Sequence, residues 1–182
     1  MKKIMFNDKY GLTEAVLEGR KTMTRRIIPI DETRGGLVPI SFWNGKWVGA
    51  HGRPLKRQPY KIGEVVAVAQ AYRDIRDIIG DVHDGKSIKF MPGWSNKMFV
   101  RAELMPHQIR ITKVRIERLQ DISEEDCVKE GVWEAQQVNY TSIDGIPFSP
   151  IEAFSALIDK VSGKGTWESN PWVFVYEFEL VK

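Results

Sequence analysis

Cysteine is nearly absent from this chain of 182 residues, and its scarcity excludes two kinds of structure. The single cysteine, Cys127, has no partner for an intrachain disulfide and cannot form a cluster of cysteine ligands. Histidine is scarce as well: His51, His83 and His107 are far apart and lack the short spacings that are typical of metal ligands. The sequence therefore predicts neither a disulfide framework nor a bound metal.

Long apolar runs are also missing. No window approaches the roughly 20 apolar residues that a transmembrane helix needs. Residues 1–8 contain two lysines but no apolar stretch as long as that of a signal peptide. Gly35-Gly36 is an isolated pair and not a glycine-rich phosphate loop. We therefore expect a soluble, cytoplasmic protein without a membrane anchor or a cofactor.

The chain has little excess charge of either sign. Its 27 Lys and Arg residues exceed its 24 Asp and Glu residues by only three, so an acidic partner must be argued from where the cations lie. Hydrophobic residues make up 42% of the chain and charged residues 28%, which is typical of a globular protein. A length of 182 residues fits one domain, residues 1–182, that carries insertions.

In the first half of the chain, turn residues and periodicity predict one helix and several strands. The helix spans residues 9–18, is capped by Asn7 or Asp8, and ends where Gly19 supplies a left-handed conformation. Asn44-Gly45 is a strong signal for a tight hairpin turn. We expect strands at residues 2–6, 37–43, 46–50 and 64–70.

Two capping patterns predict helices in the second half. Ser123 opens a short helix that ends at Gly131, and Ser149 opens a longer one that ends at Gly163. Between the two halves, residues 72–96 have no clear periodicity and are rich in Gly and Asp, which indicates an irregular inserted segment.

Two further strands complete the pattern and suggest the fold class. Residues 109–119 alternate but change phase near Thr112-Lys113, which predicts a bulge or a barrel corner. Residues 172–180 alternate with period two, and the following share one face: Trp172, Phe174, Tyr176, Phe178 and Leu180. Helices are few and scattered among strands, without a βαβ rhythm. The sequence therefore predicts an α+β protein with a mixed β-barrel and a few peripheral helices.

The segment from Gly19 to Arg26 is the first candidate site. It combines four cations with two hydroxyl groups directly after a helix end: Arg20, Lys21, Thr22, Thr24, Arg25 and Arg26. Fixed guanidinium groups, a lysine and hydroxyl donors are the groups that bind an anion. The alternative interpretation is a solvated charged turn without a ligand. Downstream, Arg53, Lys56 and Arg57 extend the positive charge in a stretch free of acids.

The spacing of Lys21 and Thr24 leaves a question open. Residues three apart share a face on a helical turn but point in opposite directions on a regular strand. The pair can act as base and nucleophile only if both side chains face the same way. Lys21 must in addition lose its proton near neutral pH, which requires burial or neighbouring cations such as Arg20 and Arg25.

Glu130 and two tryptophans are weaker candidates. A carboxylate at a helix C-terminus opposes the helix dipole, so Glu130 suggests a pairing with a cation, although an ordinary surface glutamate is the alternative. Trp94 and Trp133 lie in irregular segments and are candidates for stacking on bases.

The chain resembles the ASCH-domain proteins, a branch of the PUA-like superfamily. The resemblance rests on residues 6–26 with Gly-Arg-Lys-Thr-Met-Thr-Arg-Arg, on 61–68, on 114–131 with its Glu130-Gly131 pair, and on the closing strand 170–178. It covers about two thirds of the chain; residues 72–106 and 133–148 fall outside it. The longer form is similar to proteins often carried by phages and prophages. The resemblance implies a PUA-like β-barrel that binds RNA or nucleosides in a cleft.

A small bacterial branch of that superfamily hydrolyses N4-acetylcytidine with a Lys, a Thr and a Glu. Its Arg-Lys-Thr-x-Thr run matches residues 20–24 here, and its Glu lies on the helix where Glu130 stands. The resemblance thus implies Thr24 as nucleophile, Lys21 as its base and Glu130 as proton carrier. Arg25 departs from the pattern, because the small enzymes have an apolar residue there.

Two functions from different classes therefore remain open. The first is a module that binds RNA or a nucleotide-like ligand, and the second is an amidohydrolase that acts on an acylated nucleoside. A closed pocket that joins Lys21, Thr24 and Glu130 favours the enzyme, whereas an open basic groove that continues towards Arg53 and Arg57 favours nucleic acid. A structural or partner-binding role is a third possibility.

Overall fold

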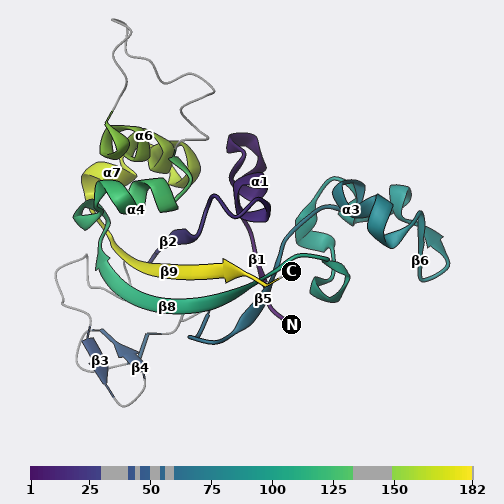
Figure 1. Ribbon diagram of the computed structural model, residues 1–182, viewed down its shortest axis with the longest axis horizontal. Coiled ribbons are helices and arrows are strands. Elements are labelled where there is room, and N and C mark those ends of the chain that lie inside the picture. Colours follow the sequence, from purple (N-terminus) through teal and green to yellow (C-terminus); the bar gives the residue numbers. More distant parts are fainter. Residues whose placement is uncertain (30–40, 44–45, 50–53, 56–59, 133–148, 182) are drawn as a thin grey trace, which may run out of the picture.

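A sheet of five strands forms the centre of the protein (Figure 1). The computed structural model describes residues 1–182 except 30–40, 44–45, 50–53, 56–59, 133–148 and 182. In spatial order the strands are β1 (Lys3–Ile4), β5 (Val65–Val68), β8 (Gln108–Arg118), β9 (Trp172–Leu180) and β2 (Met23–Ile27). The described strands form an open sheet with β1 and β2 at its edges, so the α+β class is confirmed and barrel closure stays a prediction.

Strands β8 and β9 form the longest ladder and curve together across the molecule (Figure 1). They run antiparallel from Ile109 opposite Leu180 to Arg118 opposite Trp172. Their register shifts between Ile111 and Lys113, where the sequence predicted a bulge. Strand β2 continues the antiparallel pairing beyond β9, whereas β1 pairs with β5 in parallel.

Strand β9 is buried on both faces, although its alternation predicted only one apolar face towards the core. Phe174 and Tyr176 contact the rings of Trp47 and Tyr60 on one side. Val173 and Val175 are also fully buried, because helices lie over the opposite face of the sheet (Figure 1). These helices are α4 (Glu124–Lys129), α6 (Pro150–Ser162) and α7 (Thr166–Ser169).

The helix caps form where the sequence predicted them. Ser123 accepts a hydrogen bond from the backbone of Asp126, and Ser149 forms a reciprocal capping box with Glu152. The helix expected at residues 9–18 is divided by Gly11 into a 3₁₀ turn, Asp8–Tyr10, and helix α1, Leu12–Leu17. The division arises because Gly11 has a left-handed backbone with φ of 66°.

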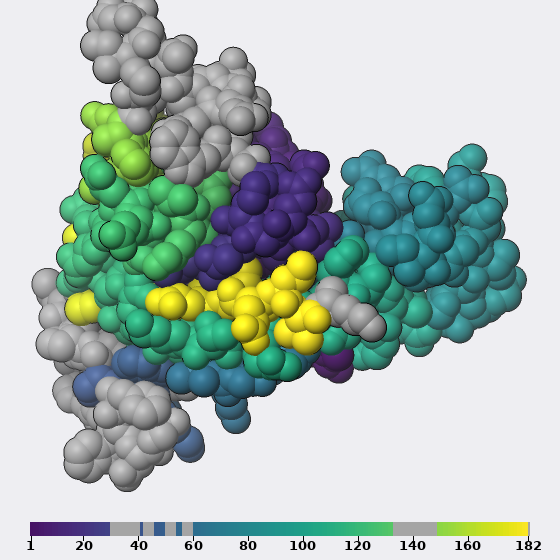
Figure 2. Space-filling view, viewed as in Figure 1, coloured from purple at the N-terminus to yellow at the C-terminus, as the bar shows by residue number. Residues whose placement is uncertain are grey.

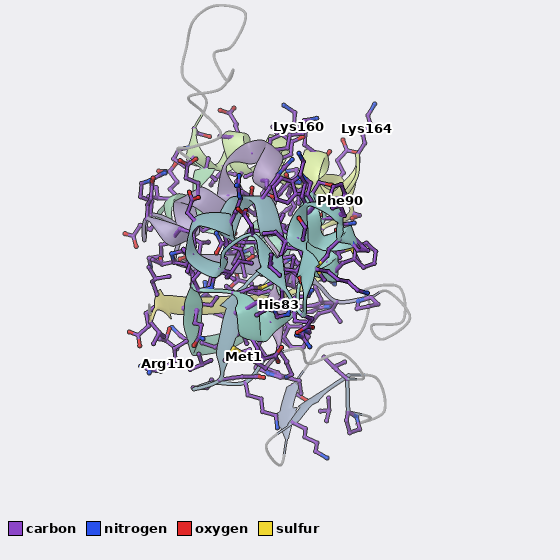
Figure 3. The ribbon with its side chains drawn as sticks, turned by 90° about the vertical axis from the view of Figure 1, so that its right-hand side faces the viewer. Met1, His83, Phe90, Arg110, Lys160 and Lys164 are labelled. Carbon is purple, nitrogen blue, oxygen red and sulfur yellow. The ribbon has the colours of Figure 1, made fainter. Side chains whose placement is uncertain are left out.

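Residues 72–106 form a lobe that projects from one end of the sheet (Figures 1 and 2). We expected an irregular segment, but it contains helix α3 (Tyr72–Ile79) and the small hairpin of β6 (Val82–His83) and β7 (Lys86–Ser87). Short 3₁₀ turns follow at Ile88–Phe90, Pro92–Trp94, Lys97–Phe99 and Ala102–Leu104. The lobe has its own buried cluster, and Trp94 packs half-buried against it. Phe90 lies at the surface of the lobe (Figure 3).

A second hairpin, β3 (Ser41–Trp43) with β4 (Lys46–Val48), lies below the sheet in Figure 1. Its antiparallel pairing confirms the hairpin predicted around Asn44-Gly45, within the residues that the structure describes. None of the described helices is long and apolar enough to cross a membrane.

Candidate functional site

A pocket lies along the edge strand β2, between this strand, the segment after β1 and helix α6. Its volume is about 270 Å³. Four consecutive residues of β2, Thr24 to Ile27, line the pocket. The lining residues are Met5, Phe6, Asn7, Leu12, Lys21, Thr24, Arg25, Arg26, Ile27, Glu130, Phe154, Leu157, Ile158, Val161 and Ser162.

Lys21 and Glu130 form a buried ion pair in the wall of this pocket. The Lys21 side chain is 2% exposed and that of Glu130 is 6% exposed. Lys21 Nζ donates to Glu130 Oε2 at 2.7 Å and to the backbone oxygen of Glu130 at 2.6 Å. Glu130 is thus not a surface glutamate, and its pairing with a cation offsets its unfavourable place at a helix C-terminus.

The turn after α1 brings Lys21 to the end of α4. Gly19 adopts a left-handed backbone with φ of 75°, which ends α1 and turns the chain. The Lys21 backbone N–H then bonds to Ala15 O at 2.9 Å, and that of Thr22 to Lys129 O at 3.0 Å. A Cβ added at Gly131 would lie 3.4 Å from the Lys21 side chain. The close approach of the two segments therefore places Lys21 against Glu130.

Thr24 is buried in β2 and lines the same pocket as Lys21 and Glu130. Two residues on a regular strand at this spacing would point to opposite faces, but Lys21 precedes the strand, which begins at Met23. The structure therefore brings together the three side chains that the family resemblance singled out.

Arg25 is enclosed by carboxylates. Its guanidinium is 1% exposed and bonds to Glu117 at 2.5 Å, to Asp126 at 3.0 Å and to Glu130 at 3.1 Å. Burial acts to lower the pKa of Arg25, but these carboxylates outweigh burial and raise it. Its charged donors are therefore directed at the protein and not at solvent.

Arg26 is the cation best placed to meet a ligand. It is half-buried in the pocket wall, donates to Met5 O, and lies over the Phe6 ring with its guanidinium carbon 5.7 Å from the centroid. No ion pair with a carboxylate is recorded for Arg26 among the described residues.

The environment of Lys21 lowers the pKa of its amine. Burial lowers the pKa of Lys21 from its ordinary value, and the charges of Arg26 and Arg25 lower it further. Glu130 acts in the opposite direction through its charge and its hydrogen bond, yet the net direction is downward. A lysine in such a setting is suited to gain and lose a proton.

The other predicted site residues lie apart from the pocket or outside the described residues. Arg20 is exposed and pairs with Glu18, and Thr22 contributes backbone hydrogen bonds without lining the pocket. Outside the described residues lie Arg53, Lys56, Arg57 and Trp133. In the part of the chain that is described, no group of three or more His, Cys, Asp or Glu residues is placed to hold a metal ion.

Sequence reasoning missed two groups of residues around the site. Glu117, Asp126 and Arg115 form the charged surroundings of Arg25, and Arg115 bonds to both of these carboxylates. The alternation of Arg115 with Glu117 on β8 was the only local signal. Phe154 and Leu157 of α6 form an apolar wall of the pocket.

The chain is similar to two solved structures of bacterial proteins. One is a protein from Enterococcus faecalis of the family DUF984, with 15% identity and a TM-score of 0.40; the match covers 93% of this chain and 66% of that chain. This chain thus spans just under two thirds of the length of that protein. The other is an ASCH domain from Lactobacillus crispatus, with 14% identity, a TM-score of 0.37 and coverage of 96% and 72%. No protein-family profile and no curated protein matches the chain.

Proposed function

We propose that this chain is an ASCH-type domain that binds a nucleoside, or a single nucleotide unit of an RNA, in the pocket beside β2. The observation that carries the proposal is the presence of Lys21, Thr24 and Glu130 in one pocket with Arg26 at its wall. A volume of about 270 Å³ is near the lower end of small-molecule sites, so it suits one base and sugar better than a duplex.

The pocket has an apolar wall and a polar wall, and a nucleoside likewise has apolar base faces and polar edges and hydroxyls. Phe154 and Leu157 offer apolar surface for the faces of a base. Lys21 and Thr24 supply donors, and Glu130 supplies acceptor oxygens, which suit the polar edge of a base or the hydroxyls of a sugar. Arg26 adds a guanidinium that suits a phosphate.

Calorimetric titration with cytidine, cytidine monophosphate and a short single-stranded RNA tests the proposal. We expect measurable binding of at least one of these ligands by the native protein and a loss of about tenfold or more with Lys21→Met. If Arg26 contacts a phosphate, Arg26→Gln weakens binding of the monophosphate more than binding of cytidine, and the affinities for the monophosphate and the RNA, but not for cytidine, fall with salt. Arg20→Gln is the matched control, because Arg20 lies outside the pocket. Binding that is equal in all variants would contradict the proposal.

Hydrolysis of an N4-acylated cytidine is the second candidate function, and it is favoured by the buried Lys21 and Thr24, which line the same pocket. In this reaction neutral Lys21 takes the proton of Thr24 while Oγ1 attacks the amide carbonyl. The C–N bond breaks, and Glu130 receives from Lys21 the proton that came from Thr24 and passes it to the nitrogen of the leaving amine, which returns Lys21 to its neutral form. Water then hydrolyses the Thr24 ester, which releases the carboxylic acid and restores the hydroxyl. The lowered pKa of Lys21 suits its role as base.

The second candidate is tested with N4-acetylcytidine by following release of cytidine. We expect turnover by the native protein and none above background with Lys21→Ala or Thr24→Val. Thr24→Val retains the shape of the side chain, so it separates loss of the nucleophile from loss of binding. Binding of cytidine without any turnover of the acetylated compound would exclude the amidohydrolase and leave the binding function intact.

A further inference from the structure

The carboxylate of Glu130 is divided between two cations. Lys21 Nζ lies 2.7 Å from Oε2, and Arg25 Nη1 lies 3.1 Å from Oε1. All three side chains are almost completely buried. The carboxylate therefore has a cation on each oxygen, which restricts its rotation.

Arg25 is itself held in place from two other elements. Its Nη2 bonds to Glu117 of β8 and to Asp126 of α4. Arg115 binds the same two carboxylates, so they form a bridge between the two arginines. The guanidinium carbon also lies 5.9 Å from the ring centroid of Phe154, a residue of the pocket wall. These contacts leave the Arg25 guanidinium one position and direct it at Glu130.

We propose that Arg25 is a positioning residue that anchors the carboxylate of Glu130 and thereby sets the orientation and the charge state of Lys21. The inference rests on the proposed function insofar as the pocket is the ligand site. It goes beyond that function because it assigns Arg25 to Glu130 and Lys21 and not to the ligand.

The charges that face Lys21 are few. Glu130 comes from the end of α4, and Arg25 and Arg26 come from β2; the other residues that line the pocket are uncharged. The positive charge of Arg25 opposes protonation of Lys21 directly. It also holds Oε1 of Glu130, so that Lys21 bonds to one carboxylate oxygen and not to both. Removal of Arg25 would therefore raise the affinity of Lys21 for its proton by two routes.

A merely structural role for Arg25 predicts a different result. In that case its removal lowers stability but leaves the titration of Lys21 unchanged in molecules that remain folded. The pH titration of Lys21 therefore separates the two roles, whereas a loss of stability alone does not.

The test is an NMR titration of the lysine side-chain carbons of the ligand-free protein, with the Lys21 signal assigned by Lys21→Met. It compares the native protein with Arg25→Gln, Arg25→Lys and the control Arg115→Gln. Arg115 binds Glu117 and Asp126 but makes no recorded bond to Glu130. We expect Arg25→Gln to shift the Lys21 midpoint upwards by about one pH unit or more, Arg25→Lys to shift it less, and Arg115→Gln to leave it nearly unchanged.

An unchanged Lys21 midpoint in folded Arg25→Gln would overturn the proposal, as would an equal shift with Arg115→Gln. If Arg25→Gln does not fold, the double variant Arg25→Gln/Glu117→Gln removes one of the buried carboxylates that would be left unpaired. The same upward shift is expected in the double variant, and its absence there also overturns the proposal. Because no ligand is used, the result stands apart from a failure of the native protein to bind nucleosides.

Discussion

At the scale of single residues, the site depends on buried charges that neutralise one another. Lys21 and Glu130 are both withdrawn from water, and each would be a costly buried charge without the other. Arg25 adds a second cation to the same carboxylate. The three side chains therefore stabilise the protein only when all of them are present, because removal of one leaves a buried charge unpaired.

Glu130→Gln is therefore expected to lower the free energy of unfolding by about 3 kcal/mol, because it leaves Lys21 and Arg25 without their shared carboxylate. Lys21→Met/Glu130→Gln is expected to lose less than the sum of the two single variants. Urea denaturation at pH 7 measures all three proteins. Strictly additive losses would show that the two side chains are not coupled.

The thiol of Cys127 makes the free energy of unfolding depend on pH in the alkaline range. Burial raises the pKa of Cys127 from 9.0 to about 12; Arg25 opposes this effect, and Glu130 and Asp126 add to it. The unfolded thiol ionises first, so the stabilising contribution is complete below pH 9.0 and is lost as the pH rises towards 12.

Cys127→Ala is expected to show a shallower decline of stability between pH 9 and 11 than the native protein. The difference in slope is at most about 1.4 kcal/mol per pH unit, the value for one proton. Tyr60 and Tyr176, whose pKa values burial also raises, contribute equally to both proteins. Urea titrations over this range measure the slopes, and parallel curves would contradict the prediction.

At the scale of secondary-structure elements, helix α4 links the carboxylates around Arg25 to the pocket. It supplies Asp126 to Arg25 and ends at Glu130. The helix has only six residues, so its stability depends on its cap and on packing. Ser123 provides that cap by accepting a hydrogen bond from the Asp126 backbone.

Ser123→Ala is expected to lower the free energy of unfolding by about 1 kcal/mol and to weaken ligand binding through a less ordered Glu130. Ser123→Asp is the control, because its carboxylate retains the cap and suits the positive end of the helix dipole. Urea denaturation and cytidine titration measure the two effects. The interpretation fails if the alanine and aspartate variants behave alike.

Secondary-structure elements were predictable from the sequence where neighbouring residues determine them. The caps at Ser123 and Ser149, the turn at Gly19 and the phase change near Thr112 each depend on a few neighbouring residues. Burial of Arg25 was not predictable, because its carboxylate partners lie about 90 to 105 positions away along the chain. The basic run therefore resembled an open anion site, whereas the terminal nitrogens of Arg25 bond to carboxylates inside the protein.

At the scale of the whole molecule, two lysines join the projecting lobe to the N-terminal segment, residues 3–8. Lys3 Nζ donates to the backbone oxygens of Lys97, Met98 and Val100, at 3.1, 2.6 and 2.8 Å. Lys97 Nζ reaches back to Phe6 O and Asp8, each at 2.6 Å. Phe6 also lines the pocket, so the bond from Lys97 connects the lobe directly to the pocket wall.

Lys3→Met is expected to increase amide hydrogen exchange in residues 97–105 by about tenfold, because three charge-assisted bonds are lost there. Exchange in β8 and β9 should change little. Lys2→Met is the control, since Lys2 pairs with Glu64 at the sheet. Equal exchange in the two variants would contradict a fastening role for Lys3.

The pairing of strand β2 has a further consequence for the order in which the protein folds. Its recorded strand partner is β9, and Met23 pairs with Glu177. During synthesis, the segment that carries Lys21, Thr24 and Arg25 therefore cannot pair with β9 until about 150 further residues have been made. Contacts so distant in sequence form late and slowly. We therefore expect the pocket to be among the last parts of the protein to form.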